Sequence, residues 1–169
     1  QFMLICSMNP CPCGNYGSRA QGCRCTPHQI RTYLNRISGP LLDRIDLHIE
    51  VESIPADDLA APGDEEASAA VRARVEAARA VQRERYRGQG ISCNARLDAR
   101  TLGPNCPMNA DARKLLRDAS EAMGFSNRAY TRVVKVARTI ADLEGGGAIA
   151  SGHVAEAVQY RALDRKYWG

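Results

Sequence analysis

The sequence predicts a mainly α-helical protein with a small β component, divided into two parts. Two apolar runs, FMLICS at residues 2–7 and a second at residues 45–51, have the composition of buried β-strands. Beyond residue 66 the apolar residues recur at helical spacing, interrupted by short breaks rich in glycine. A stretch rich in proline, glycine and acidic residues separates these two patterns. We therefore expect a first domain at residues 1–54, a linker at 55–66 and a helical domain at 67–169.

Length and composition limit the class of protein. A chain of 169 residues can bury a core of its own. Its net charge of +4 is compatible with nucleic-acid binding but does not by itself indicate it. No apolar run approaches the ~18 residues that a membrane-spanning helix requires, and no signal peptide is recognisable. Together with the clustered cysteines, this predicts a cytoplasmic protein without a membrane partner.

The first predicted strand needs neighbours to form a sheet. FMLICS has the composition of a strand buried on both faces of a parallel sheet, and it begins one residue after Gln1. Only residues 45–51 offer a second convincing strand. We therefore expect the chain to be a fragment of a larger protein, with the other strands of the sheet elsewhere.

Four of the seven cysteines follow the first predicted strand on one short loop. They are Cys11, Cys13, Cys23 and Cys25. Four thiolates complete the tetrahedral shell of Zn²⁺, and the glycines between them allow tight turns. The Cys-x-Cys spacing leaves less slack than the usual Cys-x₂-Cys, so a disulfide or merely packed thiols remain alternatives to a structural metal. His28 is the substitute ligand if one cysteine does not bind.

A short helix and a turn are expected after the cysteine loop. Thr26 and Pro27 form a typical N-cap and first-turn pair, which predicts a helix through residue 37. The sequence Ser38-Gly39-Pro40 ends it. The following LLDRIDLHIEV is expected to pass from a helical turn into the second strand.

Four helices are predicted after the linker, at about residues 65–87, 110–123, 126–144 and 151–165, with a loop at 88–109. Gly124 is a typical C-cap, Ser126 and Ser151 are typical N-caps, and the three glycines at 145–147 end the third helix. These helices form a four-helix unit on short loops.

The helix at 65–87 combines an apolar stripe with many arginines. Its apolar positions are Val71, Val75, Ala78 and Val81. Arg72 can pair with Glu76 one turn later. We therefore favour a solvated, ion-paired face over direct contact with DNA.

A complete nucleotide-binding loop is missing from the sequence. The segment from Gly17 to Arg24 has the glycine spacing of a phosphate-binding loop, but it lacks the lysine and the following Ser or Thr. No nucleophile, base and orienting group form a hydrolytic set either.

Five segments together resemble a known family. They are the strand closing on MNPCPCG, the cysteine loop, SGPLLDRIDLHIEV, SNRAYTRVVKVARTIADLEG and HVAEAVQYR. In this order they resemble the carboxy-terminal half of the magnesium-chelatase-like AAA+ ATPases, in particular the YifB/ComM group. The resemblance covers nearly the whole chain. It implies that the first domain is the edge of an AAA+ α/β core with two short strands, and that the second is a four-helix lid domain.

The resemblance assigns roles to two residues of the first domain. Asn9 resembles sensor 1, which lies between the γ-phosphate of ATP and the attacking water. Arg44, in LLDRIDL, resembles the arginine finger that reaches the nucleotide of a neighbouring subunit. Taken locally, Asn9 is a turn residue before a proline, and Arg44 would pair with Asp43 or Asp46.

A third role falls in the lid domain. Arg128 resembles sensor 2, which contacts the γ-phosphate of its own subunit's nucleotide. Its place in the first turn of a helix is unfavourable for a cation, and Ser126 already caps that end, so a purely structural role explains it poorly. Arg132, one turn later, is the reserve candidate.

The resemblance also implies a function. The Walker motifs that hold ATP and Mg²⁺ are absent, so this chain alone is expected to be inactive. The whole protein would be a homo-hexameric motor that acts on DNA in branch migration during natural transformation and recombination. A zinc-stabilised, non-catalytic DNA- or protein-binding adaptor is the alternative, with the basic helix 65–87 as its contact surface. A magnesium chelatase subunit is a further alternative, but it gives no reason for the cysteine loop.

Overall fold

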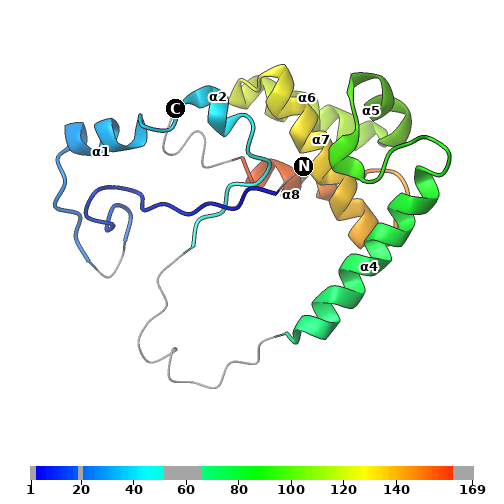
Figure 1. The fold of residues 1–169 in the computed structure, drawn as a ribbon. Coiled ribbons are helices and arrows are strands. Elements are labelled where there is room, and N and C mark those ends of the chain that lie inside the picture. Colours follow the sequence, from blue (N-terminus) through cyan, green and yellow to red (C-terminus); the bar gives the residue numbers. More distant parts are fainter. Residues whose placement is uncertain (1–2, 19–20, 52–65, 162–169) are drawn as a thin grey trace.

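The protein is mainly helical. The computed structural model describes residues 3–18, 21–51 and 66–161. Two short helices belong to the first part, α1 (Pro27–Leu34) and α2 (Gly39–Leu42). The second part contains α4 (Ser68–Arg85), a 3₁₀ turn η1 (Asn94–Arg96), α5 (Ala99–Asn105), α6 (Ala110–Met123), α7 (Asn127–Leu143) and α8 (Ser151–Gln159) (Figure 1). We call residues 68–159 the helical region.

The two expected strands are not observed in the described ranges. Residues 3–7 and 45–51 are irregular there, while residue 2 lies outside those ranges. The reason is that a strand exists only when a neighbour pairs with its backbone. The apolar side chains of Met3 and Ile5 are accordingly exposed. Within the described residues, β-type pairing is limited to one isolated parallel bridge between Met108 and Ile149.

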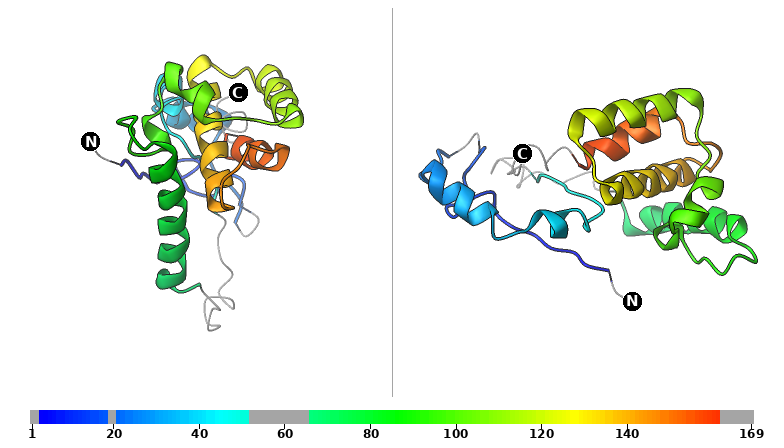
Figure 2. Two further views of the ribbon diagram at one scale, coloured as in Figure 1. Left: turned by 90° about the vertical axis from the view of Figure 1, so that its right-hand side faces the viewer. Right: turned by 90° about the horizontal axis from the view of Figure 1, so that it is seen from above.

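The hydrophobic core lies in the helical region, with α7 at its centre. This helix packs against α8, α4, α5 and η1, and α6 packs against α8. The buried residues of the core are Tyr86, Leu97, Cys106, Ala112, Leu116, Val133, Val134, Ala137, Ile140, Ala141, Ile149, Val154 and Ala157. Figure 2 shows this region at one end of the molecule and α1 at the other, with α2 between them.

The expected loop at residues 88–109 contains helical structure. Asp98 begins α5 with a capping box, in which its carboxylate accepts from the backbone N–H of Thr101 at 2.8 Å. Gly103 and Pro104, which suggested a loop, occupy the last turns of this short helix. Cys106 follows directly and is buried in the core. The helical region therefore has five α-helices rather than four.

Several predicted helix ends are confirmed. Thr26 caps α1 with a capping box, although the helix ends at Leu34 rather than at residue 37. Ser126 caps α7 by accepting from the Ala129 N–H at 3.1 Å. Gly124 ends α6 in the left-handed conformation at φ 62°, which glycine adopts without strain.

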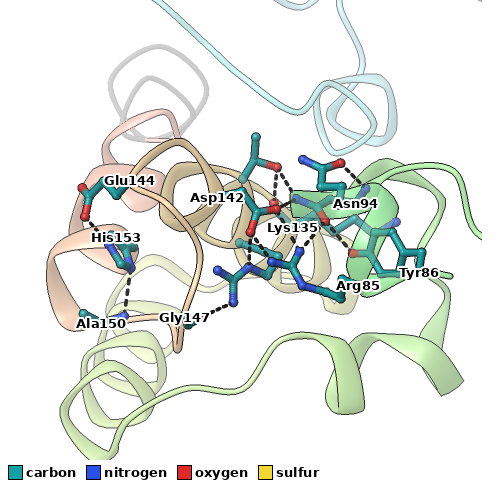
Figure 3. A network of polar contacts seen from close by, with 12 residues as sticks. Arg85, Tyr86, Asn94, Lys135, Asp142, Glu144, Gly147, Ala150 and His153 are labelled. Carbon is teal, nitrogen blue, oxygen red and sulfur yellow. Dashed lines mark hydrogen bonds and ion pairs between the residues drawn. The ribbon is translucent and has the colours of Figure 1, made fainter. Parts of the chain in front are cut away.

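One predicted cap is wrong. Ser151 is the first residue of α8, and Ala150 precedes it as the N-cap. The ring of His153 performs the capping, because its Nδ1 accepts from the Ala150 N–H at 2.9 Å. Its Nε2 lies 2.8 Å from the carboxylate of Glu144, which fixes the ring (Figure 3).

Only the second half of α4 packs against the core. Ala78 and Gln82 are buried, whereas Val71 and Val75 remain exposed. The first half of the helix extends away from the other helices (Figure 1). The predicted apolar stripe is thus buried over part of its length. None of the helices in the described ranges combines the length and the apolar composition that crossing a bilayer requires.

A buried carboxylate joins three elements of the helical region. Asp142 of α7 accepts from Arg85 of α4, from Asn94 of η1 at 2.8 Å and from Arg138 of α7 at 3.1 Å (Figure 3). Arg138 in turn donates to the carbonyl of Gly147 at 2.6 Å, in the glycine loop before α8. The hydrogen bond to Asp142, and to a lesser extent the charge of this carboxylate, raise the pKa of Arg85 above its ordinary value.

Replacing Asp142 by asparagine is expected to lower the free energy of unfolding by about 3–5 kcal/mol, because it leaves buried guanidinium groups without their carboxylate. Urea denaturation measures this change. The control is Glu76→Gln, which removes an exposed carboxylate paired with Arg79 and Arg83 and should cost about 1 kcal/mol or less. A loss below about 1 kcal/mol in Asp142→Asn would contradict the structural role of the network.

Candidate functional site

The four loop cysteines converge in space. The sulfur atoms of Cys11, Cys13, Cys23 and Cys25 all lie within 4.8 Å of one another, and His28 does not belong to this group. The loop reverses at Gly14, whose N–H donates to the carbonyl of Cys11 at 3.0 Å. Gly14 has φ +83°, which a residue with a side chain rarely adopts. The turn thus brings the first pair of sulfurs against the second.

The spacing of these sulfurs suits one tetrahedral ion. The Sγ atom of Cys11 lies 3.4 Å from that of Cys13 and 3.7 Å from that of Cys23, and Cys13 and Cys23 are also 3.7 Å apart. Four sulfurs at ~2.3 Å from a central Zn²⁺ would lie about 3.8 Å from one another. A disulfide needs its sulfurs at about 2.05 Å, and all four thiols are free here. The set therefore fits a thiophilic cation.

The environment differs among the four thiols. Cys11 is fully buried. Backbone hydrogen bonds at Asn15 and then Arg24 lower the pKa of Cys13 to about 6, because they stabilise its thiolate. Loss of solvent, followed by hydrogen bonding to Cys13 and Cys11, raises the pKa of Cys25 to about 12. A divalent cation would remove the difference between the lowered pKa of Cys13 and the raised pKa of Cys25, because it favours the thiolate form at all four positions.

We expect about one Zn²⁺ per chain when the protein is purified under reducing conditions without chelator. Elemental analysis measures the ratio. The double variant Cys11→Ser/Cys23→Ser should lose most of the metal, because two ligands disappear. A matched control is Cys93→Ser, since Cys93 lies outside the cluster. A metal content near zero in the unmodified protein would contradict a metal site.

Asn9 lies directly beside the cysteine loop. Its side chain is exposed, and a Cβ placed on Gly14 would lie 3.8 Å from its Cγ and Nδ2 atoms. The predicted sensor and the predicted metal loop are therefore neighbours.

Arg44 is exposed and carries no partner carboxylate among the described residues. Its Nη1 donates to the carbonyl of Pro40 at 2.5 Å, one turn earlier. The local alternative of an ion pair with Asp43 or Asp46 is not observed. Both aspartates instead point to the helical region.

Asp43 and Asp46 attach the segment around Arg44 to helix α7. The carboxylate of Asp43 accepts from the hydroxyl of Ser126 at 2.8 Å. Asp46 forms an ion pair with Arg132. The reserve candidate Arg132 is therefore engaged in this contact.

Arg128 lies in the first turn of α7 with an exposed side chain. No described carboxylate pairs with it, which leaves its guanidinium available. No described contact joins Arg128, Arg44 and Asn9 directly. Arg128 and Arg44 nevertheless lie close in sequence to the two ends of the same hydrogen bond, between Ser126 and Asp43.

The sequence did not identify one functional candidate of this region, Arg161. Arg161 follows α8 and is 1% exposed. It donates to the carbonyls of Leu42 and Ile45, at 3.3 and 2.6 Å. The available signal was its place in HVAEAVQYR, a segment that carried the resemblance but was assigned no role.

The arginines of α4 are largely paired along the chain. Arg74 pairs with Glu66 at 2.6 Å, and Arg79 pairs with Glu76 at 3.6 Å. The predicted pair between Arg72 and Glu76 is replaced by contacts of Glu76 with arginines further along the helix. This pattern supports the solvated, ion-paired face.

The arginines of the cysteine loop and α1 differ from those of α4 in having no carboxylate partner among the described residues. Acidic residues are absent from the sequence before Asp43. Arg24, Arg31 and Arg36 are exposed, and no carboxylate among the described residues pairs with them. An open groove of about 430 Å³ between the loop and α1 is lined by Pro12, His28, Gln29, Thr32, Tyr33 and Arg36.

Two family models match this chain, one over the helical region and one over the cysteine-bearing segment. The magnesium chelatase subunit ChlI C-terminal family matches residues 65–161, and the magnesium chelatase subunit ChlI family matches residues 1–59. The chain belongs to the magnesium chelatase ChlI family, whose members are AAA+ ATPases.

Curated relatives match almost all of the chain. It is 45% identical to the uncharacterized protein YifB of Salmonella typhimurium over 166 residues. The matched stretch makes up 98% of this chain and 32% of that protein. It is 43% identical over 166 residues to the competence protein ComM of Haemophilus influenzae, covering 98% and 31%. YifB of Escherichia coli is 42% identical over 168 residues, covering 98% and 32%. The chain thus spans about a third of the length of these relatives.

Proposed function

We propose that this chain is the carboxy-terminal part of an AAA+ ATPase motor that acts on DNA. In this proposal residues 1–54 belong to the AAA+ core, 55–66 form the linker and 67–169 form the lid. Asn9 acts as sensor 1, Arg44 as the arginine finger and Arg128 as sensor 2. The intact protein binds ATP with Mg²⁺ and assembles as a homo-hexamer.

The observation that carries the proposal is the exposure of two arginines beside one contact. Arg44 and Arg128 flank the hydrogen bond between Asp43 and Ser126, and neither has a described carboxylate partner. An exposed, unpaired guanidinium is suited to forking onto phosphate oxygens as charge develops on them. A cation in the first turn of α7 is unfavourable for the helix itself, which supports a role outside it.

DNA is proposed as the partner on two grounds. One relative is named a competence protein, and competence concerns the uptake of DNA. The acid-free cysteine loop and α1 present arginines that pair with no carboxylate of the described residues, beside the groove that Tyr33 lines. Arginines with an aromatic side chain suit the phosphates and bases of a single strand. The arginines of α4 are mostly engaged with carboxylates and are the weaker candidate surface.

The cysteine cluster supports a second candidate function, a zinc-stabilised adaptor that binds DNA or protein without hydrolysing ATP. In both proposals the metal is structural, because four thiolates leave no open position for a substrate. Hydrolysis distinguishes them, since only the motor turns over ATP.

We expect the full-length protein to hydrolyse ATP, with turnover that responds to single-stranded DNA. Residues 1–169 alone should neither hydrolyse ATP nor bind it with micromolar affinity, because the sensors and the finger act on phosphates that a Walker loop must hold. Calorimetry with the Mg²⁺ complex of ATP tests the second statement. Low micromolar affinity in the isolated chain would mean that the nucleotide site has been mislocated, and a full-length protein without turnover would favour the adaptor.

A further inference from the structure

Arg161 holds the backbone on both sides of Arg44. Its Nη1 lies 2.6 Å from the carbonyl oxygen of Ile45 and 3.3 Å from that of Leu42. Its Nη2 lies 3.5 Å from the carboxylate of Asp43. One buried guanidinium thus bonds to the residues immediately before and after Arg44, and to a carbonyl one residue further back.

Two more contacts fix the same segment to α7 and to the residue that follows α8. The N–H of His48 donates to the carbonyl of Tyr160, the residue before Arg161, at 3.0 Å. The ion pair between Asp46 and Arg132 lies between these points. Residues 42–48 are therefore held along their length by α7 and by the end of α8, while the side chain of Arg44 stays exposed.

We infer that Arg161 is a positioning residue for Arg44 and sets the direction in which this arginine leaves the protein surface. The inference rests on the proposed function, in which Arg44 reaches a neighbouring subunit's nucleotide. A misplacement of about 1 Å at a reacting group can lower turnover by about 10²-fold. A buried arginine suits the task, because Nη1 of its rigid fork holds both carbonyls while Nη2 reaches the Asp43 carboxylate.

In this proposal α7 also links the nucleotide site of its own subunit to that of the neighbouring subunit. Ser126, whose hydroxyl donates to Asp43, caps the helix that carries Arg128. Movement of α7 on contact with its own nucleotide would therefore move the segment that carries Arg44. The position of Arg44 relative to the neighbouring subunit's nucleotide then depends on the nucleotide bound in its own subunit.

The first test is hydrogen exchange in the full-length protein. In Arg161→Gln, the amides of residues 42–48 should exchange at least about 10-fold faster, because the carbonyls of residues 42 and 45 lose their donor. Arg138→Gln is the matched control, since Arg138 is equally buried but bonds to Asp142 and Gly147. The control should loosen the glycine loop and leave residues 42–48 unchanged. Unchanged exchange at 42–48 in Arg161→Gln would overturn the inference.

The second test is ATP turnover. Arg161→Gln should lower kcat about 10- to 100-fold with little change in KM for ATP, because a finger acts on the transition state rather than on ground-state binding. Arg161→Lys keeps the buried charge but has a single nitrogen, which cannot span the carbonyls and the Asp43 carboxylate as the guanidinium does, and should fall between wild type and Arg161→Gln. Equal kcat in all three proteins would overturn the inference.

Mixing of subunits separates positioning from general damage. Subunits with Arg161→Gln keep their own phosphate site and lack only an effective finger for the neighbour. Mixed with subunits that lack the Walker lysine, they should regain activity as Arg44→Ala subunits do. Failure to regain activity would overturn the positioning role. If Arg44→Ala itself left turnover unchanged, the proposed function would fail, whereas an effect of Arg44→Ala without one of Arg161→Gln would reject this inference alone.

Discussion

Replacing Arg44 by alanine in the full-length protein is expected to reduce ATP turnover by about 10²-fold or more, because a charge that stabilises the transition state is removed. The variant should fold normally, since Arg44 is exposed and its described side-chain contact is with the Pro40 carbonyl. Steady-state hydrolysis measures turnover, and thermal unfolding checks the fold.

Arg117→Ala is the matched control for this variant. Arg117 is also exposed, has no described carboxylate partner and lies on α6, outside the surfaces proposed to bind ATP or DNA. It should leave basal turnover within about two-fold, since it is assigned no role at the nucleotide. Unchanged turnover in Arg44→Ala would reject the motor at its central residue and favour the adaptor.

Replacing Arg128 by alanine should lower ATP turnover by a similar factor of about 10² or more, but through a different site. In the proposal Arg44 acts on a neighbour's nucleotide and Arg128 on its own. Mixed oligomers distinguish the two. When Arg44→Ala subunits are mixed with subunits lacking the Walker lysine, some interfaces combine an intact finger with an intact phosphate loop, and partial activity should return.

Mixed oligomers of Arg128→Ala subunits and subunits lacking the Walker lysine should not regain ATP turnover. Every site then lacks either its own sensor or its own lysine, so no interface is complete. Recovery of both pairings, or of neither, would contradict the assignment of Arg44 to the neighbour's site and Arg128 to its own. The measurement is turnover as a function of the mixing ratio.

Local signals in the sequence predicted local structure well. Thr26, Ser126 and Gly124 cap their helices as expected, because a cap depends on one side chain and the next few backbone groups. Ser151 does not cap α8, because the helix begins one residue earlier than expected, with Ala150 as the N-cap and its N–H donating to the ring of His153. The helix α5 was missed because Gly103 and Pro104 read as breakers, while the capping box at Asp98 outweighed them.

Features that depend on distant residues were not predictable in this way. The strand expected at residues 45–51 requires a paired neighbour, which an apolar run does not supply. The cysteine cluster was predictable because its four members share one short loop. Arg161 was not, because its partners lie 116 to 119 residues earlier in the chain and no spacing rule connects them.

The distance along the chain between Arg161 and its partners affects when the segment that carries Arg44 folds during synthesis. A ribosome adds roughly 5–20 residues each second, so residues 42–45 emerge on the order of 10 s before Arg161. During this interval the carbonyls that Arg161 will bind are solvated, and the Asp43 and Asp46 carboxylates also await partners 83 and 86 residues downstream. The contacts among α4, α7 and α8 join residues closer in sequence and can form earlier. The segment that carries Arg44 is therefore among the last to become ordered, after the helices that hold it have folded.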